Sequence, residues 1–260
     1  MTGIRRKSKK DQRKQKIDKR ATQIRSYISQ RRAYFISKRI FDLIISSLVI
    51  IFILSWLFPI VAILIKLDSK GPILFIQRRV GFLGRSFMCF KFRTMVINSL
   101  SDEKQATAND PRITRLGHFL RITSLDELPQ FFNVLRGEMS IVGPRPHMHK
   151  DNEDFGRQIE NYRLRCFLKP GITGMAQVKG LRGPAQDFFR IFHRYQWDTF
   201  YIRNANLSLD FKIIRLTAFQ LIKSIVSFKK TPSVQKQQTT IPAETHGAIS
   251  FVEVPVKGVQ

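Results

Sequence analysis

Residues 43–65 read LIISSLVIIFILSWLFPIVAILI, a run of 23 residues without one charged side chain. As an α-helix this run would be about 34 Å long at about 1.5 Å per residue, long enough to cross a hydrocarbon layer about 30 Å thick. It is too long for a cleaved signal peptide and has no small-residue cleavage site. A buried core helix is the other alternative, but a helix that is apolar on every side is unusual beside a dense cluster of cations. The run therefore favours a membrane helix.

Positive charge lies on both sides of this run. Before it, residues 1–39 hold 15 Lys and Arg against Asp11 and Asp18, a net +13 out of the chain's +26. After it, residues 66–93 hold seven Lys and Arg against Asp68. Because Lys and Arg beside a membrane helix favour the cytoplasmic side, both flanks are expected on that side. A re-entrant helix, which enters and leaves the membrane on one face, satisfies this better than the alternative, a single span.

A proline predicts where such a helix bends. Pro59 has no N–H, so the carbonyl of Ser55 loses its helical partner and the axis kinks. The Ser55 hydroxyl is close enough in sequence to hydrogen-bond backbone groups at the break. We therefore predict a membrane helix over residues 38–66 that bends near Ser55 and Pro59.

The rest of the chain has the composition of a folded domain with two appendages. An apolar fraction of 43% with 22 Phe excludes a disordered chain. Two cysteines, Cys89 and Cys166, are too few for a disulfide framework or a cysteine zinc site. We expect a basic arm over residues 1–37 that is disordered or interfacial, a cytoplasmic domain over residues 67–228 and a flexible tail over residues 229–260.

The expected fold is α+β, mainly helical with a small β-hairpin, and membrane-associated. Strands are predicted over residues 73–77 and 87–92, with Gly81 and Gly84 in the loop between them. Helices are predicted over residues 114–120, 128–135, 151–167, 187–202 and 209–228. The last of these helices could pack in the core or lie flat on a membrane.

The chemistry has to be found without the usual motifs. The large positive charge requires an anionic partner, which could be nucleic acid, anionic lipid or a phosphorylated substrate. The sequence holds no Walker-type loop, no dinucleotide-binding glycine motif, no zinc-protease motif and no Asp-x-Asp pair. A carboxylate pair, Asp126-Glu127, remains, and it follows three arginines, Arg112, Arg115 and Arg121.

Two compatible interpretations of this carboxylate pair are open. Ser124 lies three residues before Glu127, which is the spacing of a capping box at the start of a helix, where the helix dipole also favours Asp126. In the functional interpretation, a carboxylate held among cations stays ionised and acts as a nucleophile. Its neighbour would then hold Mg²⁺ against a phosphate.

A loop with two prolines follows the carboxylate pair further along the chain. Pro144 and Pro146 fix the backbone on either side of Arg145, so its guanidinium is well placed to grip an anion or stack on a base. A purely structural turn is the alternative. His147 and His149 are two residues apart, a poor spacing for metal ligands on one helix face, and we interpret them as non-catalytic.

Seven motifs in a fixed order carry a family resemblance. They lie at residues 38–42, 65–72, 91–95, 123–130, 137–140, 142–146 and 169–174. Each motif is weak alone, but the ordered set over residues 38–228 closely resembles the bacterial sugar transferases, the monotopic phosphoglycosyl transferases. Many members of this family bend the membrane helix at an adjacent Ser-Pro, whereas here Trp56 follows Ser55 and the proline is Pro59.

The resemblance implies an activity and a location. The family transfers a sugar 1-phosphate from a UDP-sugar to polyprenyl (undecaprenyl) phosphate, releases UMP, uses Mg²⁺ and has a re-entrant membrane helix. This is the initiating step of exopolysaccharide, O-antigen or capsule synthesis. The implied location is the bacterial inner membrane with the catalytic domain on its cytoplasmic face. The implied partners are a UDP-sugar, polyprenyl phosphate and anionic lipid, which basic residues beside the membrane would bind, and no nucleic acid is expected.

The resemblance also implies roles for individual residues. Asp126 would be the nucleophile that forms an aspartyl-phosphosugar, and Glu127 would serve the metal and the charge of the transition state. Arg145, between Pro144 and Pro146, resembles the residue that contacts the uridine end of the donor. Further substrate-binding assignments fall on Arg121, Lys91, Arg93 and Asp210.

Two other functions remain as alternatives. A membrane-tethered nucleic-acid-binding protein would explain the charge, although no nucleic-acid motif is present. An inactive relative that serves as a scaffold for glycan assembly is the second. The sugar is left open among hexose, N-acetylhexosamine and modified bacillosamine donors, with specificity expected in a loop at residues 180–186. The oligomeric state is also left open.

Overall fold

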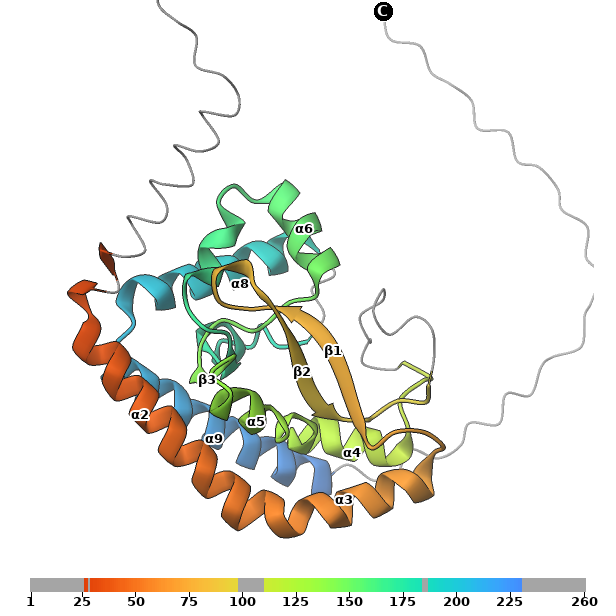
Figure 1. The fold of residues 1–260 in the computed structure, drawn as a ribbon. Coiled ribbons are helices and arrows are strands. Elements are labelled where there is room, and N and C mark those ends of the chain that lie inside the picture. The colour runs from red at the N-terminus through yellow and green to blue at the C-terminus, as the bar shows by residue number, and fades with distance from the viewer. Residues whose placement is uncertain (1–25, 28, 98–109, 184–186, 231–260) are drawn as a thin grey trace, which may run out of the picture.

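The computed structural model describes residues 26–27, 29–97, 110–183 and 187–230 (Figure 1). Most of the predicted basic arm, residues 98–109 of a polar loop and nearly all of the predicted tail lie outside the described residues. Part of the loop expected to set sugar specificity, residues 184–186, also lies outside them. Within the described residues the predicted fold class is confirmed, since helices dominate and one β-hairpin accompanies them.

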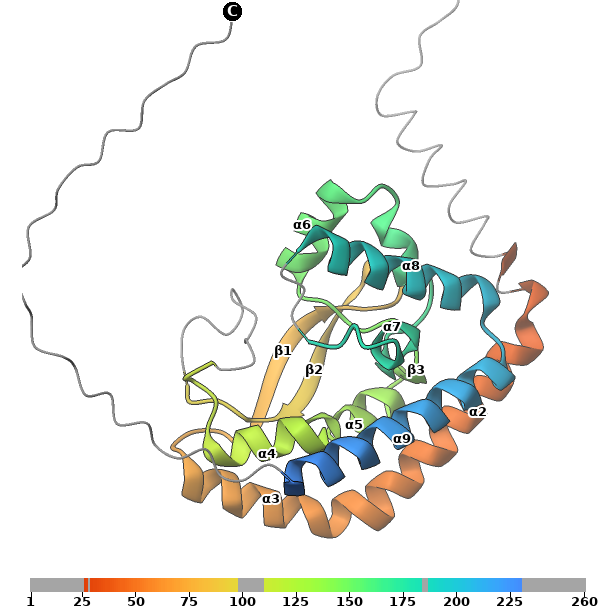
Figure 2. The same ribbon diagram turned by 180° about the vertical axis from the view of Figure 1, so that it is seen from behind.

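The apolar run forms one long bent helix. It comprises α2 (Arg32–Val49), the π-helical segment η1 (Ile50–Leu54) and α3 (Ser55–Asp68). The helix begins six residues before the predicted start at residue 38. Figures 1 and 2 show α2 and α3 as two arms of a bend that opens toward the rest of the protein.

Both predicted features accompany the bend. The wider π-helical turn ends directly before Ser55, whose hydroxyl donates a hydrogen bond to the Ile51 carbonyl at 2.5 Å. Pro59 lies inside α3 and removes one further backbone hydrogen bond. A π-turn and a proline are both known causes of sharp kinks. The π-turn itself was not predicted, because no sequence pattern distinguishes it from regular helix.

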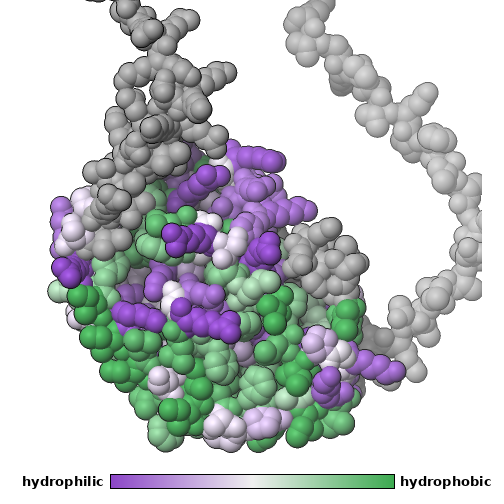
Figure 3. All heavy atoms as spheres, viewed as in Figure 1, coloured by the Kyte–Doolittle hydropathy of each residue, from purple (hydrophilic) through white to green (hydrophobic). Residues whose placement is uncertain are grey.

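The long helix buries its inner face and exposes its outer face. Leu54, Val61 and Ile65 pack against Phe92 and Leu120 of the domain. On the outer side large apolar residues are exposed, with Phe52 at 67%, and Figure 3 shows apolar residues gathered along the rim that α2 and α3 form in Figure 1. Among the described residues this is the one helix long and apolar enough to cross a membrane, and only 22% of its most apolar window is buried. A core helix would be mostly buried, so the alternative of a core helix is not supported.

Polar residues at the start of the helix attach it to the domain. Lys38 pairs with Asp210 at 2.8 Å, and the Asp42 carboxylate accepts a hydrogen bond from the Ile141 backbone N–H at 3.0 Å. Arg39 donates to the Val134 and Leu135 carbonyls, at 2.7 and 3.0 Å. Those carbonyls belong to the last turn of a domain helix, where a cation is favourable. The first arm is therefore fixed to the domain by directed contacts.

Two small sheets lie above the bend. The predicted hairpin is confirmed as β1 (Leu74–Val80) and β2 (Ser86–Phe92), antiparallel with Gln77 opposite Cys89. The second sheet, β3 (Ser140–Val142) and β4 (Gly171–Thr173), is parallel and was not predicted. It requires glycine, because a Cβ on Gly171 would overlap the backbone nitrogen of Gly143.

The remaining elements are helical. In chain order they are the 3₁₀ turn η2 (Phe82–Gly84) in the hairpin loop, α4 (Arg115–Thr123), the 3₁₀ turn η3 (Leu125–Glu127), α5 (Gln130–Leu135), α6 (His149–Gln158), the 3₁₀ segment η4 (Tyr162–Phe167), α7 (Met175–Val178), α8 (Phe188–Asn204) and α9 (Leu207–Lys230). The single helix predicted over residues 151–167 is wrong. It stops at Gln158, Ile159 is extended, and Asn161 has a left-handed φ of 59° before the 3₁₀ segment.

The last helix has two distinct sides. Ile213 is fully buried in the main core with Val134, Met139 and Val142. The opposite side exposes large apolar residues, with Phe219 at 66%. Helix α9 runs beside α2 in both ribbon views (Figures 1 and 2). Both options for this helix therefore find support, because one side packs in the core and the other adds to the exposed apolar surface.

Candidate active site

The carboxylate pair lies in a sharp connection between α4 and α5. Ser124 has a left-handed φ of 59° and ends α4, and Asp126 and Glu127 follow in the 3₁₀ turn η3. Both carboxylate residues are buried, at 9% and 5% exposure. The capping-box interpretation is wrong, because the Glu127 N–H bonds the Ser124 backbone carbonyl at 3.2 Å and the Ser124 side chain makes no capping bond. With the capping role absent, the burial of two adjacent carboxylates needs another explanation.

Glu127 is held by three cations from three parts of the chain. Its Oε1 accepts hydrogen bonds from Lys91 at the end of β2 and from Arg145 of the proline loop, both at 2.8 Å. Its Oε2 accepts a hydrogen bond from Arg182, in the loop before α8, at 3.2 Å. Burial alone would raise the pKa of Glu127, but these cations together hold it well below its usual range. Glu127 is therefore ionised at neutral pH and serves as the common partner of the three segments.

Asp126 has the opposite environment. Burial raises the pKa of Asp126, the neighbouring Glu127 charge adds to this, and Lys91 and Arg121 oppose it. None of the described residues donates a hydrogen bond to its carboxylate, while Arg121 uses its Nε–H to bond the Thr94 hydroxyl at 2.9 Å. Of the two adjacent carboxylates, Glu127 is held by three cations of the protein, and Asp126 accepts no hydrogen bond from the described residues.

The charge around the pair is positive overall. Four cations, Lys91, Arg121, Arg145 and Arg182, interact electrostatically with the two carboxylates, so this set of described residues carries two more positive than negative charges. Partial burial strengthens the interaction of these charges with an anion, because water screens it less. A site with this excess is suited to an anion with several charges, such as a diphosphate.

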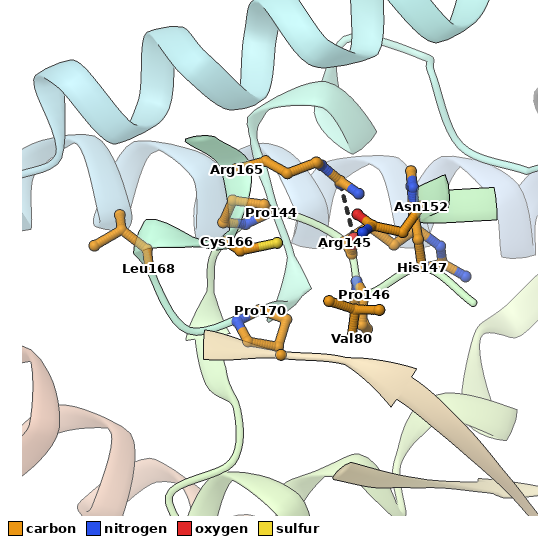
Figure 4. Close-up of a pocket in the computed structure, with 11 residues that line it drawn as sticks. Val80, Pro144, Arg145, Pro146, His147, Asn152, Arg165, Cys166, Leu168 and Pro170 are labelled. Carbon is orange, nitrogen blue, oxygen red and sulfur yellow. Dashed lines mark hydrogen bonds between the residues drawn. The ribbon is translucent and has the colours of Figure 1, made fainter. Parts of the chain in front are cut away.

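Hydrogen bonds to its backbone carbonyls hold the proline loop, residues 143–146, in place. The Gly171 N–H donates to the Pro144 carbonyl at 3.0 Å, and Arg165 donates to the Arg145 carbonyl at 2.8 Å (Figure 4). A cavity of about 10 Å³ lies behind the loop, close to the volume that one water molecule needs. His147 lines this cavity, and its Nδ1 is hydrogen-bonded to the Tyr162 hydroxyl at 2.8 Å. Burial holds the pKa of His147 well below its usual range, so its ring is neutral.

Two residues predicted for the site have contacts elsewhere. Arg93 donates to the carbonyls of Ile65, Ser69 and Lys70, and so caps the C-terminal end of α3. Asp210 accepts hydrogen bonds from three residues of α2 and α8: Tyr34, Lys38 and Tyr201. The structure brings together Lys91, Arg121, Asp126, Glu127 and Arg145, and gives Arg93 and Asp210 contacts that connect the membrane helix to the domain.

Arg182 is the site residue that the sequence reasoning did not identify. The available signal was its position between Gly180 and Gly183, whose φ angles of 82° and 94° only glycine adopts easily. These glycines turn the chain so that Arg182 reaches Glu127 while 41% of its side chain stays exposed. This loop therefore contributes a cation as well as a candidate for sugar specificity.

A divalent metal would find only part of its ligands here. Within the described residues no group of three or more His, Cys, Asp and Glu side chains is placed to hold a metal. Mg²⁺ commonly takes one or two protein carboxylates and completes its shell with substrate phosphates and water. Asp126 and the less occupied Oε2 of Glu127, which accepts one hydrogen bond against two at Oε1, fit that requirement.

Comparison with known proteins identifies the family. The family model "Bacterial sugar transferase" matches residues 33–224. A UDP-glucose:undecaprenyl-phosphate glucose-1-phosphate transferase of Klebsiella pneumoniae is 48% identical over 184 residues, which is 70% of this chain and 39% of that protein. The exopolysaccharide production protein PSS of Rhizobium leguminosarum bv. phaseoli is 43% identical over 182 residues, 68% of this chain and 90% of that protein.

A third relative has a different sugar in its name. The UDP-N-acetylgalactosamine-undecaprenyl-phosphate N-acetylgalactosaminephosphotransferase of Aeromonas hydrophila is 41% identical over 191 residues, 73% of this chain and 44% of that protein. The chain thus spans well under half of the Klebsiella and Aeromonas proteins. The matched region contains the bent apolar helix, the carboxylate pair and the arginine loops described above. On this evidence the chain belongs to the bacterial sugar transferase family.

Proposed function

We propose that this protein transfers a sugar 1-phosphate from a UDP-sugar to a polyprenyl phosphate and releases UMP, as the first step in building a surface glycan. The observation that carries the proposal is the asymmetry of the carboxylate pair, in which Glu127 accepts hydrogen bonds from three cations and Asp126 accepts none from the described residues. The names of the relatives support the substrate classes, a UDP-sugar and undecaprenyl phosphate.

In the first half-reaction the open carboxylate is the nucleophile. An Asp126 carboxylate oxygen attacks the phosphorus that bears the sugar, and the bond from that phosphorus to the bridging oxygen breaks. The electron pair of that bond leaves with UMP, and an aspartyl-phosphosugar remains on the protein. Arg121, Arg145 and Arg182 are placed to offset the phosphate charge, and Mg²⁺, when bound, would further neutralise it.

In the second half-reaction the lipid accepts the sugar phosphate. A phosphate oxygen of the polyprenyl phosphate attacks the aspartyl phosphorus, the Asp126–phosphorus bond breaks, and the carboxylate is regenerated. The product is a polyprenyl-diphospho-sugar. Since UMP leaves before the lipid phosphate reacts, ping-pong kinetics are expected.

The bent helix supports a location at a membrane surface. Helices α2 and α3 are the two arms of a bend that opens toward the domain, and the outer apolar face of this bend is exposed (Figures 1 and 3). In our proposal the bend enters one leaflet and returns, α9 adds its exposed apolar side, and neighbouring basic residues bind anionic lipid. The positive charge on both flanks supports a position of the domain on the cytoplasmic face, and the membrane in our proposal is the bacterial inner membrane.

The test is UMP release from a panel of donors. Native protein in detergent is supplied with undecaprenyl phosphate, Mg²⁺ and UDP-glucose, UDP-galactose or UDP-N-acetylgalactosamine, and compared with Asp126→Asn. We expect release with at least one donor, loss of release in the variant, and a mass increase of the native protein by one sugar phosphate when lipid is omitted. A folded native protein that releases UMP from none of a broad donor panel would overturn the proposal in favour of the inactive scaffold. Release that survives in Asp126→Asn would refute the role of the nucleophile.

A further inference from the structure

A buried ionic cluster lies behind the candidate active site. Arg165 of η4 donates to Asp198 Oδ2 of α8 through two nitrogens, at 2.7 and 3.2 Å. Their side chains are only 4% and 2% exposed. Arg194 precedes Asp198 by one helical turn on α8, so both lie on the same face, and Arg194 is also buried, at 4% exposure. Two guanidinium groups therefore share the neighbourhood of one buried carboxylate.

Each arginine of this cluster holds one loop of the active site. Arg165 donates to the backbone carbonyl of Arg145 at 2.8 Å. Arg194 donates to the backbone carbonyl of Gly183 at 2.8 Å, and Gly183 is the residue directly after Arg182. The two loops tethered in this way supply two of the three cations on Glu127. The cluster thus touches neither carboxylate of the pair, but it is bonded to the backbone beside two of their partners.

Asp198 makes this arrangement possible. Burial, and then the charge of Arg165, lower the pKa of Arg194 to about 10 even though Asp198 opposes both effects. Without the carboxylate, two buried guanidinium groups would repel each other with no anion between them. They would move toward water and release the carbonyls of both loops together. One residue therefore controls the placement of two segments that lie far apart in the sequence.

We propose that Asp198 is a positioning residue: through Arg165 and Arg194 it fixes the two loops so that Arg145 and Arg182 converge on Glu127 and on the diphosphate of the donor. This inference rests on the proposed function, because it assigns the two loops to the binding of a UDP-sugar. Each arginine that loses its alignment weakens a charge-assisted hydrogen bond to the donor, so Asp198→Asn is expected to weaken donor binding by about 10-fold to 100-fold.

The experiment measures donor binding without turnover. The full chain carrying Asp126→Asn is titrated with UDP-glucose and Mg²⁺ by calorimetry, and then with each other UDP-sugar of the panel. Asp198→Asn is added to this protein, to its Arg145→Ala form and to its Arg182→Ala form. If Asp198 acts through these two arginines, its effect on Kd is smaller in each arginine variant than in the parent, by at least about twofold. An equal effect in all three backgrounds would mean a general structural role and would overturn the inference.

Two further variants keep the inference testable if Asp198→Asn does not fold. Arg165→Lys retains a charge for Asp198 but cannot make all the bonds of the guanidinium, so the Arg145 carbonyl loses its donor and binding weakens. Ile202→Ala, on the same helix and buried at 7% exposure, is the matched control: it should lower the unfolding temperature and leave the Kd unchanged. Arg165→Lys with unchanged Kd would overturn the inference. If neither this parent nor the native protein binds any donor of the panel, the proposed function on which the inference rests is refuted instead.

Discussion

Replacing Glu127 by glutamine tests the central electrostatic argument for the candidate active site. The substitution keeps the size of the side chain and removes its charge. Lys91 and Arg145 each lose a charge-assisted hydrogen bond of 2.8 Å in a largely buried setting. The glutamine carbonyl oxygen can still accept from both cations, but neither bond then has an ionised acceptor, and the amide nitrogen faces the Arg182 donor instead of accepting from it.

The structure sets the size of the expected effect. Breaking a buried ion pair by removing one partner costs about 3–5 kcal/mol. The Arg182 bond adds little, because its side chain is 41% exposed and water screens the interaction. For a domain of this size about 1 kcal/mol corresponds to about 2–4 °C. We therefore expect Glu127→Gln to lower the unfolding temperature by about 10 °C.

The assay is thermal unfolding followed by circular dichroism in detergent at neutral pH. Asp154→Asn is the matched control, because Asp154 is 45% exposed and lies 3.7 Å from Arg157 in a surface ion pair, which is expected to contribute less than about 1 kcal/mol. If Glu127→Gln unfolds within about 2 °C of Asp154→Asn, the three cations do not depend on Glu127 for their placement. The reasoning about the site would then be refuted.

Four further predictions follow from the structure. Asp126→Asn should leave the unfolding temperature unchanged or raise it while activity is lost, because burial makes the ionised form of Asp126 unfavourable; a large loss of stability would contradict this. Folding lowers the pKa of Glu127, so its contribution to stability is complete above its unfolded pKa of about 4.5 and is lost as the pH falls through the folded pKa. Between pH 7 and pH 3 the unfolding temperature should therefore fall less steeply in Glu127→Gln than in the native protein. The pKa of Asp126 is raised, so the acid limb of the pH profile of UMP release should lie above the ordinary aspartate range, and a limb at or below that range would contradict the assignment. Gly171→Ala should destabilise the protein by about 1–3 kcal/mol and reduce activity, since the added Cβ displaces Gly143, whereas Gly156→Ala, on an exposed part of α6 with open space around it, should do neither.

Much of the fold could be predicted because its signals are local. The bent helix follows from an uncharged run, and the hairpin follows from alternation around Gly81 and Gly84. Helix α8 begins after Asp187, whose side chain accepts a hydrogen bond from the Arg190 N–H as a helix cap. In each case a few consecutive residues determine the local structure.

The parts that could not be predicted depend on distant residues. Strands β3 and β4 have three residues each, too few to show a period, and they form a sheet only because glycines allow their backbones to approach. The break after α6 depends on Asn161 taking a left-handed conformation, which asparagine permits but does not require. Arg182 reaches Glu127 from 55 residues away. The two residues that make each of these contacts are too far apart in the sequence for a local pattern to predict that they meet.

The membrane helix and the candidate active site are joined through pairs of adjacent residues. Phe92 and Leu120 pack against α3, and their sequence neighbours Lys91 and Arg121 act on the carboxylate pair. Successive side chains of a strand point to opposite faces, and those of a helix diverge by about 100°. The apolar contact and the charged contact therefore lie on different sides of the same short backbone segments. If the protein joins a water-soluble donor to a phosphate carried on a lipid, as we propose, the segments that position the carboxylate pair are the same ones that pack against the long bent helix on which the membrane location rests.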